Sequence, residues 1–196
     1  QDEFFCKGEE LILNCADGIQ ARLDYLNDDT FFERGHKSFL RIHQDEPGPR
    51  DMISGAQLWK KDKLFSLFSH IKGGENYSFD TQRTESIRNL SLNTYLGNTL
   101  IYEFGDINFA RFLRRHINYG YGDCDFYTEN KDNWTIKRKI KSLTHVLNRY
   151  FISYPIKSFK YDNNFETFFY LYLIGVVRYI SFIKARFSHK NSVSRP

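Results

Sequence analysis

The longest apolar stretch of the chain limits what the chain can fold into. It is the segment NNFETFFYLYLIGVVRYISFIKARF, residues 163–187, in which the part from Phe168 to Ile183 is mostly apolar and encloses Arg178. A membrane-spanning helix needs about 20 apolar residues, and an arginine near its centre costs about 3 kcal/mol. The segment therefore favours a core helix of a folded domain, and no transmembrane span is expected.

The two faces of this helix differ in polarity. The less apolar face would carry Thr167, Ile174, Arg178, Ser181 and Ala185, and the more apolar face Phe165, Phe169, Tyr172, Val176, Ile180, Ile183 and Phe187. A helix that lies on a membrane surface needs one strongly polar face, which neither set provides. We therefore expect burial on several sides. Arg178 would then need a carboxylate partner or an exit to solvent, because an unpaired buried charge is costly.

Charge is distributed unevenly along the chain. Residues 131–196 contain 13 Lys and Arg against 3 Asp and Glu, a net charge of +10, whereas residues 1–130 contain 15 against 21, a net charge of −6. A basic half can face nucleic acid, an anionic membrane or an acidic protein partner. It can also simply neutralise the acidic half within one fold.

Three cysteines, Cys6, Cys15 and Cys124, give an odd count with no Cys-x-x-Cys pair. Cys6 and Cys15 flank KGEELILN, and nine residues of straight strand at about 3.3 Å each are longer than any disulfide span. We expect three free thiols and a reducing compartment, which favours the cytoplasm.

The first half of the chain has strand and turn signals. Asp17-Gly18 suits a type I′ hairpin turn, and Ile19, Ala21, Leu23 and Tyr25 then alternate with polar residues, as in a strand with one buried face. SFLRIHQ, 38–44, is a third expected strand, and DEPGPRD, 45–51, has the composition of a loop.

A short helix and a second set of strands are expected next. Residues 62–72 favour a helix that Asp62 caps and Gly73-Gly74 ends, with Leu64, Phe65, Phe68 and Ile71 on one face. Gly97-Asn98 and Gly105-Asp106 then fit hairpin turns between strands within 89–113. Residues 107–116 fit a strand or a helix, and we take the strand.

The second half has helical periodicity. Residues 117–133, INYGYGDCDFYTENKDN, have the composition of a loop and form the expected boundary. Residues 134–151 follow as an amphipathic helix, capped by Asp132 or Asn133 and stopped by Pro155. Its apolar stripe is Ile136, Ile140, Leu143, Leu147 and Tyr150, surrounded by basic residues.

These patterns predict an α+β fold, in which an N-terminal, mostly antiparallel sheet of hairpins or a meander packs against C-terminal helices. The expected organisation is a β-rich acidic half at 1–116, a loop at 117–133 and a basic helical half at 134–196, joined in one compact unit. The helices at 134–151 and 164–187 would cover the apolar face of the sheet.

A short arginine–histidine motif is the one candidate for catalysis. Arg111 and His116 match R-x(4–6)-H, as do Arg138 and His145. This spacing resembles the catalytic motif of HEPN-type ribonucleases. The resemblance implies a metal-independent RNase in which Arg111 holds phosphate and His116 is the acid and base. The family has an all-helical bundle, whereas the first half here has strand patterns.

Basic residues interleaved with aromatics are the candidate nucleic-acid site. Rings that stack on bases and cations that hold the backbone suit single-stranded nucleic acid. The intervening aromatics are Tyr119, Tyr121, Phe126, Tyr127 and Trp134. The candidate binding residues are Arg111, Arg114, Arg115, Lys137, Arg138, Lys141 and Arg149.

The sequence thus supports three hypotheses. The first is a non-enzymatic module that contacts nucleic acid through its basic helical half, within a larger assembly. The second is a subunit whose partner is another protein, and the third is the RNase. No cofactor is expected, because the sequence has no P-loop, dinucleotide-binding or nucleophile-elbow pattern. No metal site is expected either: the histidines lack metal spacing, and the acidic residues near Cys124 lack the glycine and glutamate of a calcium loop.

Overall fold

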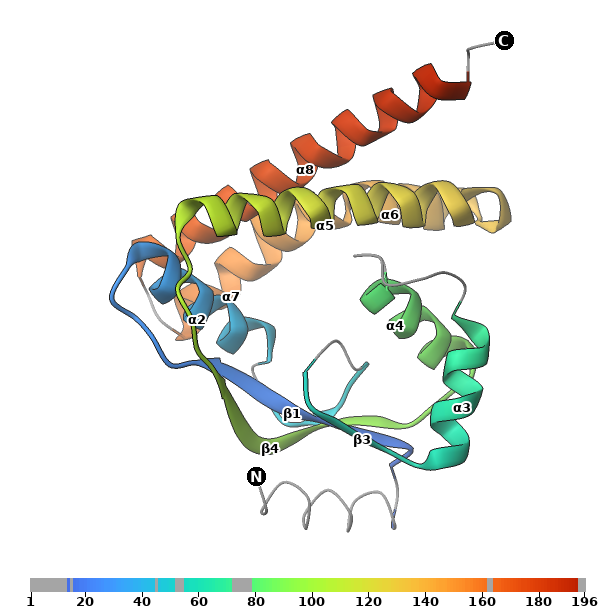
Figure 1. Ribbon diagram of the computed structural model, residues 1–196, viewed down its shortest axis with the longest axis horizontal. Coiled ribbons are helices and arrows are strands. Elements are labelled where there is room, and N and C mark those ends of the chain that lie inside the picture. Colours follow the sequence, from blue (N-terminus) through green and yellow to red (C-terminus); the bar gives the residue numbers. More distant parts are fainter. Residues whose placement is uncertain are drawn as a thin grey trace. The chain divides into compact units, whose positions relative to one another are not determined.

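The computed structural model describes residues 14, 16–44, 46–51, 55–71, 79–161 and 164–193. They form an α+β fold with a mixed four-stranded sheet in the N-terminal part and helices in the C-terminal part (Figure 1). The predicted fold class is confirmed. Cys6, Cys15 and Gly73-Gly74 lie outside the described residues.

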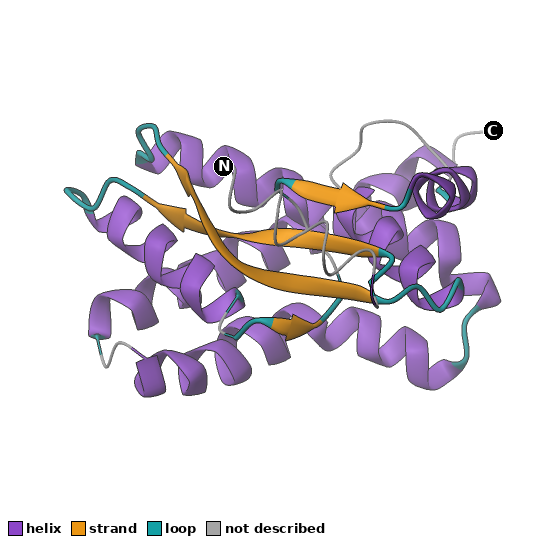
Figure 2. Cartoon of the chain, turned by 90° about the horizontal axis from the view of Figure 1, so that it is seen from below, coloured by secondary structure: helices purple, strands orange, loops and turns teal. Residues whose placement is uncertain are grey.

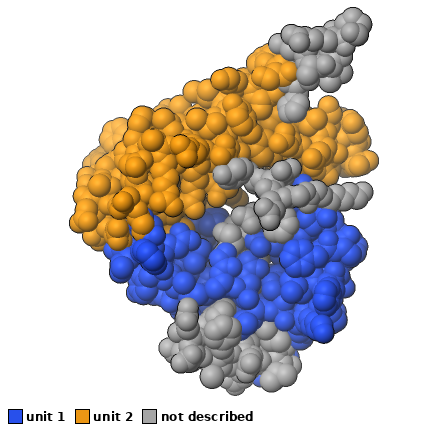
Figure 3. Space-filling view, viewed as in Figure 1, with its two compact units in different colours: residues 1–26, 43–104 blue, residues 27–42, 105–196 orange. Residues whose placement is uncertain are grey.

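The chain divides into two compact units, coloured separately in Figure 3. Unit 1 comprises residues 1–26 and 43–104, and unit 2 comprises residues 27–42 and 105–196. The predicted boundary at 117–133 is wrong, because one helix continues through most of that range. The two units are described separately, and the covering of the sheet by C-terminal helices stays a prediction.

The sheet of unit 1 contains β1 (Gly18–Tyr25), β2 (Gly48–Pro49), β3 (Gln57–Trp59) and β4 (Thr94–Glu103) in the order β2-β4-β1-β3 (Figure 2). β1 pairs with β3 and β2 with β4 in antiparallel fashion, but the central pair, β1 with β4, is parallel. The predicted hairpins and meander are therefore wrong. Parallel neighbours need a long crossover connection rather than a tight turn.

The predicted alternation in β1 is only half of its pattern. Ile19, Ala21, Leu23 and Tyr25 are buried as expected, but so are the residues between them, apart from half-buried Arg22. β1 lies between two other strands, so its polar face is covered too.

The turn signal Gly97-Asn98 forms an irregularity within a strand instead of a hairpin. β4 runs through it, and the pairing with β1 shifts from Gln20 opposite Leu96 to Arg22 opposite Leu100. Two extra residues of β4 are accommodated there, as in a β-bulge. A Cβ on Gly97 would lie 3.4 Å from the Gln20 carbonyl oxygen, so glycine suits this close backbone approach.

The strand predicted at 38–44 is wrong, because α2 (Phe31–His43) occupies this stretch. Thr30 and Glu33 form a reciprocal cap at its start. The backbone N–H of Glu33 donates to Thr30 Oγ1 at 3.2 Å, and the backbone N–H of Thr30 donates to Glu33 Oε2 at 2.9 Å. This capping box fixes the first turn of the helix.

Two further helices complete unit 1, α3 (Lys61–His70) and α4 (Phe79–Asn89). The predicted helix at 62–72 is confirmed, but its buried face is not the predicted one. Leu67 is buried with Ile87, whereas Phe65 and Phe68 are exposed. Lys60, rather than Asp62, occupies the cap position.

Unit 2 begins its helical part with α5 (Phe109–Asn130), which a single turn of 3-10 helix, η1 (Lys131–Asn133), follows. The strand at 107–116 and the loop at 117–133 are therefore wrong predictions. The Asn108 side chain caps α5 by accepting a hydrogen bond from the Arg111 backbone N–H at 2.9 Å. Gly120 and Gly122, which we took as loop residues, are buried inside this helix.

The next helix changes its winding without stopping. α6 (Ile136–Leu147) leads into a π-helical segment, η2 (Asn148–Ser153), and then into α7 (Tyr154–Tyr161). The prediction that Pro155 stops the helix is wrong. The Tyr154 backbone N–H bonds to the Arg149 carbonyl, five residues back, and this wider turn relieves the clash that a proline ring causes in an α-helix.

The buried residues of this segment also differ from the predicted stripe. Ile136 and Ile140 are exposed, and Leu143 and Leu147 are half-buried. The side chains that point into unit 2 recur at every fourth position: Ser142, Val146, Tyr150, Tyr154 and Ser158. Thr135, rather than Asp132 or Asn133, caps α6.

The longest helix, α8 (Phe165–Val193), confirms the helix predicted at 164–187. It packs along α5 in the same chain direction (Figure 1), because contacts advance together on both helices. Phe112 contacts Tyr170, and Tyr127 contacts Phe182 further along. Between them, a Cβ on Gly120 would lie 2.4 Å from the Arg178 carbonyl oxygen, so the two backbones approach closely there.

Candidate functional site

The outward face of α8 is apolar along six turns. We call the residues Phe165, Phe169, Tyr172, Val176, Ile180, Ile183 and Phe187 the apolar stripe. Six of them are exposed, from 37% for Ile183 to 72% for Phe165, and Val176 is half-buried. The expected burial of this face is wrong, because the less apolar face, with Thr167, Ile174, Ser181 and Ala185, is the one packed inside.

The length and composition of α8 are those of a membrane-spanning helix. Among the described residues this is the one helix that meets that test, over Phe165–Ser188, and 33% of its apolar window is buried. A core helix of a soluble protein can meet the same test. The absence of a transmembrane span stays a prediction, and it now rests on where Arg178 points.

Arg178 turns inward and finds a carboxylate partner on α5. Its Nε and Nη2 donate to the two oxygens of Asp123 at 2.5 and 2.8 Å, and its Nη1 donates to the Tyr150 hydroxyl at 3.1 Å. The guanidinium also lies over the Tyr119 ring, 5.2 Å from its centre. Burial alone would lower the pKa of Arg178, but Asp123 and Tyr150 outweigh burial and raise it. Arg178 is therefore charged and fully partnered.

Two histidines lie next to this ion pair. His145 Nε2 is 3.7 Å from Asp123 Oδ1, and His116 is buried on α5. Burial lowers the pKa of both, and for His116 the charges of Arg178 and Arg115 lower it further, well below the ordinary value. Within the described part of the chain His116 Nδ1 has no hydrogen-bond partner. Both imidazoles are therefore neutral at pH 7.

The structure does not bring Arg111 and His116 together. A helix turns by about 100° per residue, so five residues place them about 140° apart around α5. Arg111 is exposed, and its Nη1 donates to the Asp106 carbonyl at 3.0 Å, whereas His116 is buried. A shared substrate phosphate could not reach both side chains in this arrangement. His145 and Arg138 are the second match, and Arg138 lies over the Trp134 ring at 4.6 Å.

The predicted nucleic-acid residues fall into two separate groups. On α5, Arg111 and Arg114 are exposed, and Arg115 is half-buried with its Nη1 3.3 Å from His36 Nε2. Nineteen residues of helix, about 28 Å, separate Arg111 from the end of α5 near which α6 begins. The second group lies on α6 and η2: Lys137, Lys141 and Arg149 are exposed, and Arg138 is half-buried.

The aromatic residues between these groups belong mostly to the interior of unit 2. Phe126 and Tyr127 are buried, Tyr119 and Trp134 are half-buried, and Tyr121 is 37% exposed. Trp134 packs on Phe126 and Tyr127. The interleaving of aromatic and basic residues in the sequence thus reflects a helical core, with Tyr121 as the ring most open to stacking.

The acidic residues near Cys124 do not converge on a common point. Asp123 is committed to Arg178, while Asp125 and Glu129 lie toward the solvent side of α5. Across the described ranges, no group of three His, Cys, Asp or Glu side chains could hold a metal ion. Cys124 is a free, buried thiol, as expected, and burial raises its pKa.

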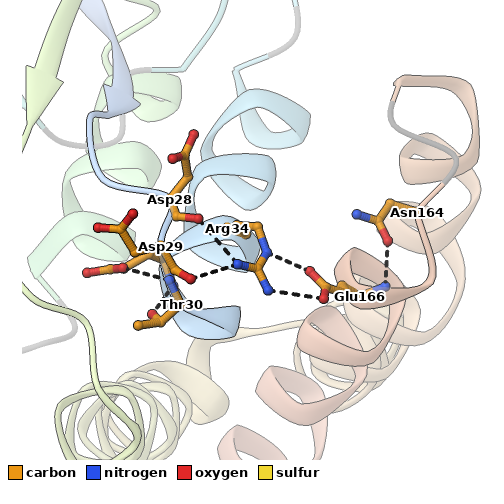
Figure 4. Close-up of polar contacts among 7 residues, drawn as sticks. Asp28, Asp29, Thr30, Arg34, Asn164 and Glu166 are labelled. Carbon is orange, nitrogen blue, oxygen red and sulfur yellow. Dashed lines mark hydrogen bonds and ion pairs between the residues drawn. The ribbon is translucent and has the colours of Figure 1, made fainter.

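The N-terminal end of α8 is tied to the start of α2 by a second ion pair (Figure 4). Arg34 donates to both oxygens of Glu166 at 2.8 and 3.1 Å and to the Asp29 carbonyl at 2.8 Å. Asp28 and Asp29 are exposed beside it. This end of α8 is therefore surrounded by carboxylates, whereas its C-terminal part carries Lys184 and Arg186.

The apolar stripe was visible in the sequence, but its outward orientation was not. The signal that could have located the inward face is the set of small or polar residues on α8 that permit close packing: Thr167, Gly175, Ser181 and Ala185. Comparison of the chain with protein-family models, with curated proteins and with solved structures found no match.

Proposed function

We propose that this chain is a non-enzymatic subunit of a larger assembly and that the apolar stripe of α8 is its contact surface. The observation that carries the proposal is the stripe itself, in which Phe165, Phe169, Ile180 and Phe187 are each at least 60% exposed. Folded monomers rarely expose a large contiguous apolar patch, and such patches mark interaction sites.

The composition of the stripe supports a protein partner. It contains aromatic and isoleucine side chains and no charged residue. Protein interfaces are enriched in aromatic anchors and depleted of charge at their centre. The polar groups that could do chemistry in unit 2, namely Asp123, Tyr150, Arg178 and the two neutral histidines, face the interior instead.

The experiment compares two matched double variants. Phe169→Glu/Ile180→Glu places charge on the stripe, and Phe65→Glu/Phe104→Glu places the same charge on exposed phenylalanines of unit 1. Sedimentation velocity and the fluorescence of a hydrophobic dye would be measured on each purified chain. We expect the wild type and the control to associate or bind dye, and the stripe variant to lose both while keeping its melting temperature.

A wild-type chain that stays monomeric and binds no dye would contradict the proposal. So would a stripe variant that behaves like the control, because the apolar contacts would then lie elsewhere.

Nucleic-acid contact is a second candidate, supported by the exposure of Lys137 and Lys141 on α6. Cations on one helical face can neutralise neighbouring phosphates, and the resulting affinity falls steeply with salt. We expect Lys137→Glu/Lys141→Glu to weaken RNA binding in a fluorescence-anisotropy titration at low salt. Lys61→Glu/Lys63→Glu on α3 is the control with the same change of charge. Equal binding by both variants would remove this candidate.

A further inference from the structure

We propose that the partner of the apolar stripe is the same stripe of a second copy of this chain, paired in antiparallel direction about a two-fold axis beside Val176. This inference rests on the proposed function and specifies its partner. It is argued from the spacing of the stripe, its straightness and the charges at its two ends.

The spacing of the stripe is symmetric about its centre. From Val176, the other members lie 4, 7 and 11 residues away in both directions. An antiparallel copy centred on Val176 therefore places a stripe residue opposite every stripe residue. Phe165 meets Phe187 of the second copy, Phe169 meets Ile183, Tyr172 meets Ile180, and Val176 meets itself.

This symmetry matters because a two-fold interface must be self-complementary. In such an interface, each contact between two positions occurs twice, with the roles of the two copies exchanged. A parallel pairing would bring identical residues together at every level. The antiparallel pairing instead places Tyr172 against Ile180 and Phe169 against Ile183, so that rings lie against branched aliphatic side chains, as in a packed core.

The stripe is straight enough to contact a second helix along its whole length. Its members repeat every 11 residues: Phe165, Val176 and Phe187; Phe169 and Ile180; Tyr172 and Ile183. Eleven residues are close to three full turns, so the stripe winds by only about 20° per repeat around a straight α-helix. It extends about 33 Å along α8.

The charges at the two ends of α8 favour the antiparallel direction. Glu166 and Lys184 are 18 residues apart, which is five full turns, so both lie along the same edge of the stripe. Antiparallel pairing brings Lys184 of one copy close to Glu166 of the other. Glu166 already contacts Arg34, but its side chain is 42% exposed, and the exposed carboxylates Asp28 and Asp29 lie nearby.

A lipid surface fits the stripe less well. Membrane-surface helices carry a strongly cationic face opposite their apolar face. The opposite face of α8 packs on α5, and the one cation along the apolar part of the helix, Arg178, is held inside by Asp123. Lipid binding is therefore an alternative outcome of the experiment.

The experiment uses single cysteines on the stripe in a Cys6→Ser/Cys15→Ser background, in which buried Cys124 remains. Val176→Cys should give a disulfide-linked dimer under mild oxidation. Phe165→Cys mixed with Phe187→Cys should give a mixed dimer. Phe165→Cys alone should not crosslink, because antiparallel pairing separates the two copies of that position by about 33 Å, and a disulfide needs Cα atoms within about 7 Å.

Three results would overturn the inference. One is a disulfide dimer of Phe165→Cys alone, which means parallel pairing. Another is association of the wild type without a Val176→Cys crosslink, which leaves a stripe-mediated assembly with a different partner or register. The third is a monomeric chain that floats with phosphatidylserine-containing vesicles unless Phe169→Glu/Ile180→Glu is present. A wild type that neither associates nor binds dye would instead overturn the proposed function together with this inference.

Discussion

One ion pair decides which side of α8 faces inward. Arg178 lies in the most apolar stretch of the chain, and its guanidinium is held by Asp123, Tyr150 and the Tyr119 ring. Taking this charge out of water is costly unless the partners are complete. The face that contains Arg178 must therefore turn toward Asp123, and the stripe on the other side turns outward as a consequence.

Replacing the acidic partner should expose this dependence. We expect Asp123→Asn to lower the free energy of unfolding by about 3–5 kcal/mol, because Arg178 keeps its charge without a counter-ion. The double variant Asp123→Leu/Arg178→Met should recover most of that loss, since no buried charge remains. Urea unfolding monitored by circular dichroism gives both values. A double variant less stable than Asp123→Asn would show that the pair contributes more than mutual neutralisation.

His116 should make the protein less stable in mild acid. Its pKa is well below the ordinary value in the folded protein, because of burial and nearby Arg178 and Arg115, whereas the unfolded chain protonates it near pH 6.5. The unfolded state then binds more protons, so stability falls as the pH drops below about 6.5, by up to about 1.4 kcal/mol per pH unit from this residue. His145 acts in the same direction.

The measurement is a series of urea titrations between neutral pH and pH 5 for the wild type and for His116→Gln. The variant removes one titrating group, so its stability should fall less steeply with acid. Identical pH dependence in both chains would mean that His116 is protonated in the folded protein.

At the residue scale, the sequence showed what Arg178 needed but not which residue would supply it. A carboxylate partner was required on energetic grounds. Asp123 lay in a stretch with two glycines and many polar residues, which we took as a loop. Tertiary packing overrides such local composition, because Gly120 and Asp123 serve contacts with α8 that are distant in sequence.

Close contact between α5 and α8 is the main packing feature of unit 2. At Gly120 an added Cβ would lie 2.4 Å from the Arg178 carbonyl oxygen and 2.6 Å from Ser181 Cβ. The neighbouring backbone cannot give way as a flexible side chain could. The glycine that weakens α5 as an isolated helix is therefore what lets the two helices pack.

Gly120→Ala should therefore destabilise the protein although alanine is the better helix former. Alanine gains about 1 kcal/mol in helix propensity, but overpacking against the α8 backbone costs typically 1–3 kcal/mol. We expect a net loss in thermal unfolding. Thr128→Ala, at an exposed position of the same helix, is the control and should change little. A stabilised Gly120→Ala variant would contradict the close approach.

At the element scale, local signals were present but incompletely used. Thr30 and Glu33 have the spacing of a capping box, and this spacing could have predicted α2 where we expected a strand. Gly97-Asn98 is a correct sign of irregular backbone, but it cannot tell a hairpin turn from a bulge. The helices at 62–72, 134–151 and 164–187 were predictable because long periodic segments carry the strongest local signal.

Across the whole molecule, the sheet is built from pairings that the sequence does not encode locally. β1 and β4 are separated by most of unit 1, and their parallel pairing depends on a crossover connection. The α+β class followed from the order of strand and helix signals. The strand order and the outward orientation of the stripe depend on long-range packing and could not be predicted in that way.

Self-association should also make the melting temperature depend on protein concentration. If α8 pairs with α8 of a second copy, raising the concentration stabilises the folded dimer by mass action. We expect the midpoint of thermal unfolding to rise by a few degrees over a hundredfold increase in concentration, given roughly 2–4 °C per kcal/mol for a chain of this size. Phe169→Glu/Ile180→Glu should melt at the same temperature at every concentration, and a wild type that does so too contradicts pairing in solution.

The π-helical segment at Asn148–Ser153 has a consequence for insertions and deletions. The buried residues from Ser142 to Ser158 recur at every fourth position, a spacing that drifts by about 40° per step on an ideal α-helix. The wider turn at η2 takes up part of this drift. Loss of a single residue there would restore regular winding but rotate everything after it by about 100°, carrying Tyr154 and Ser158 out of the interior. The length of this short segment is thus fixed, although its sequence is not.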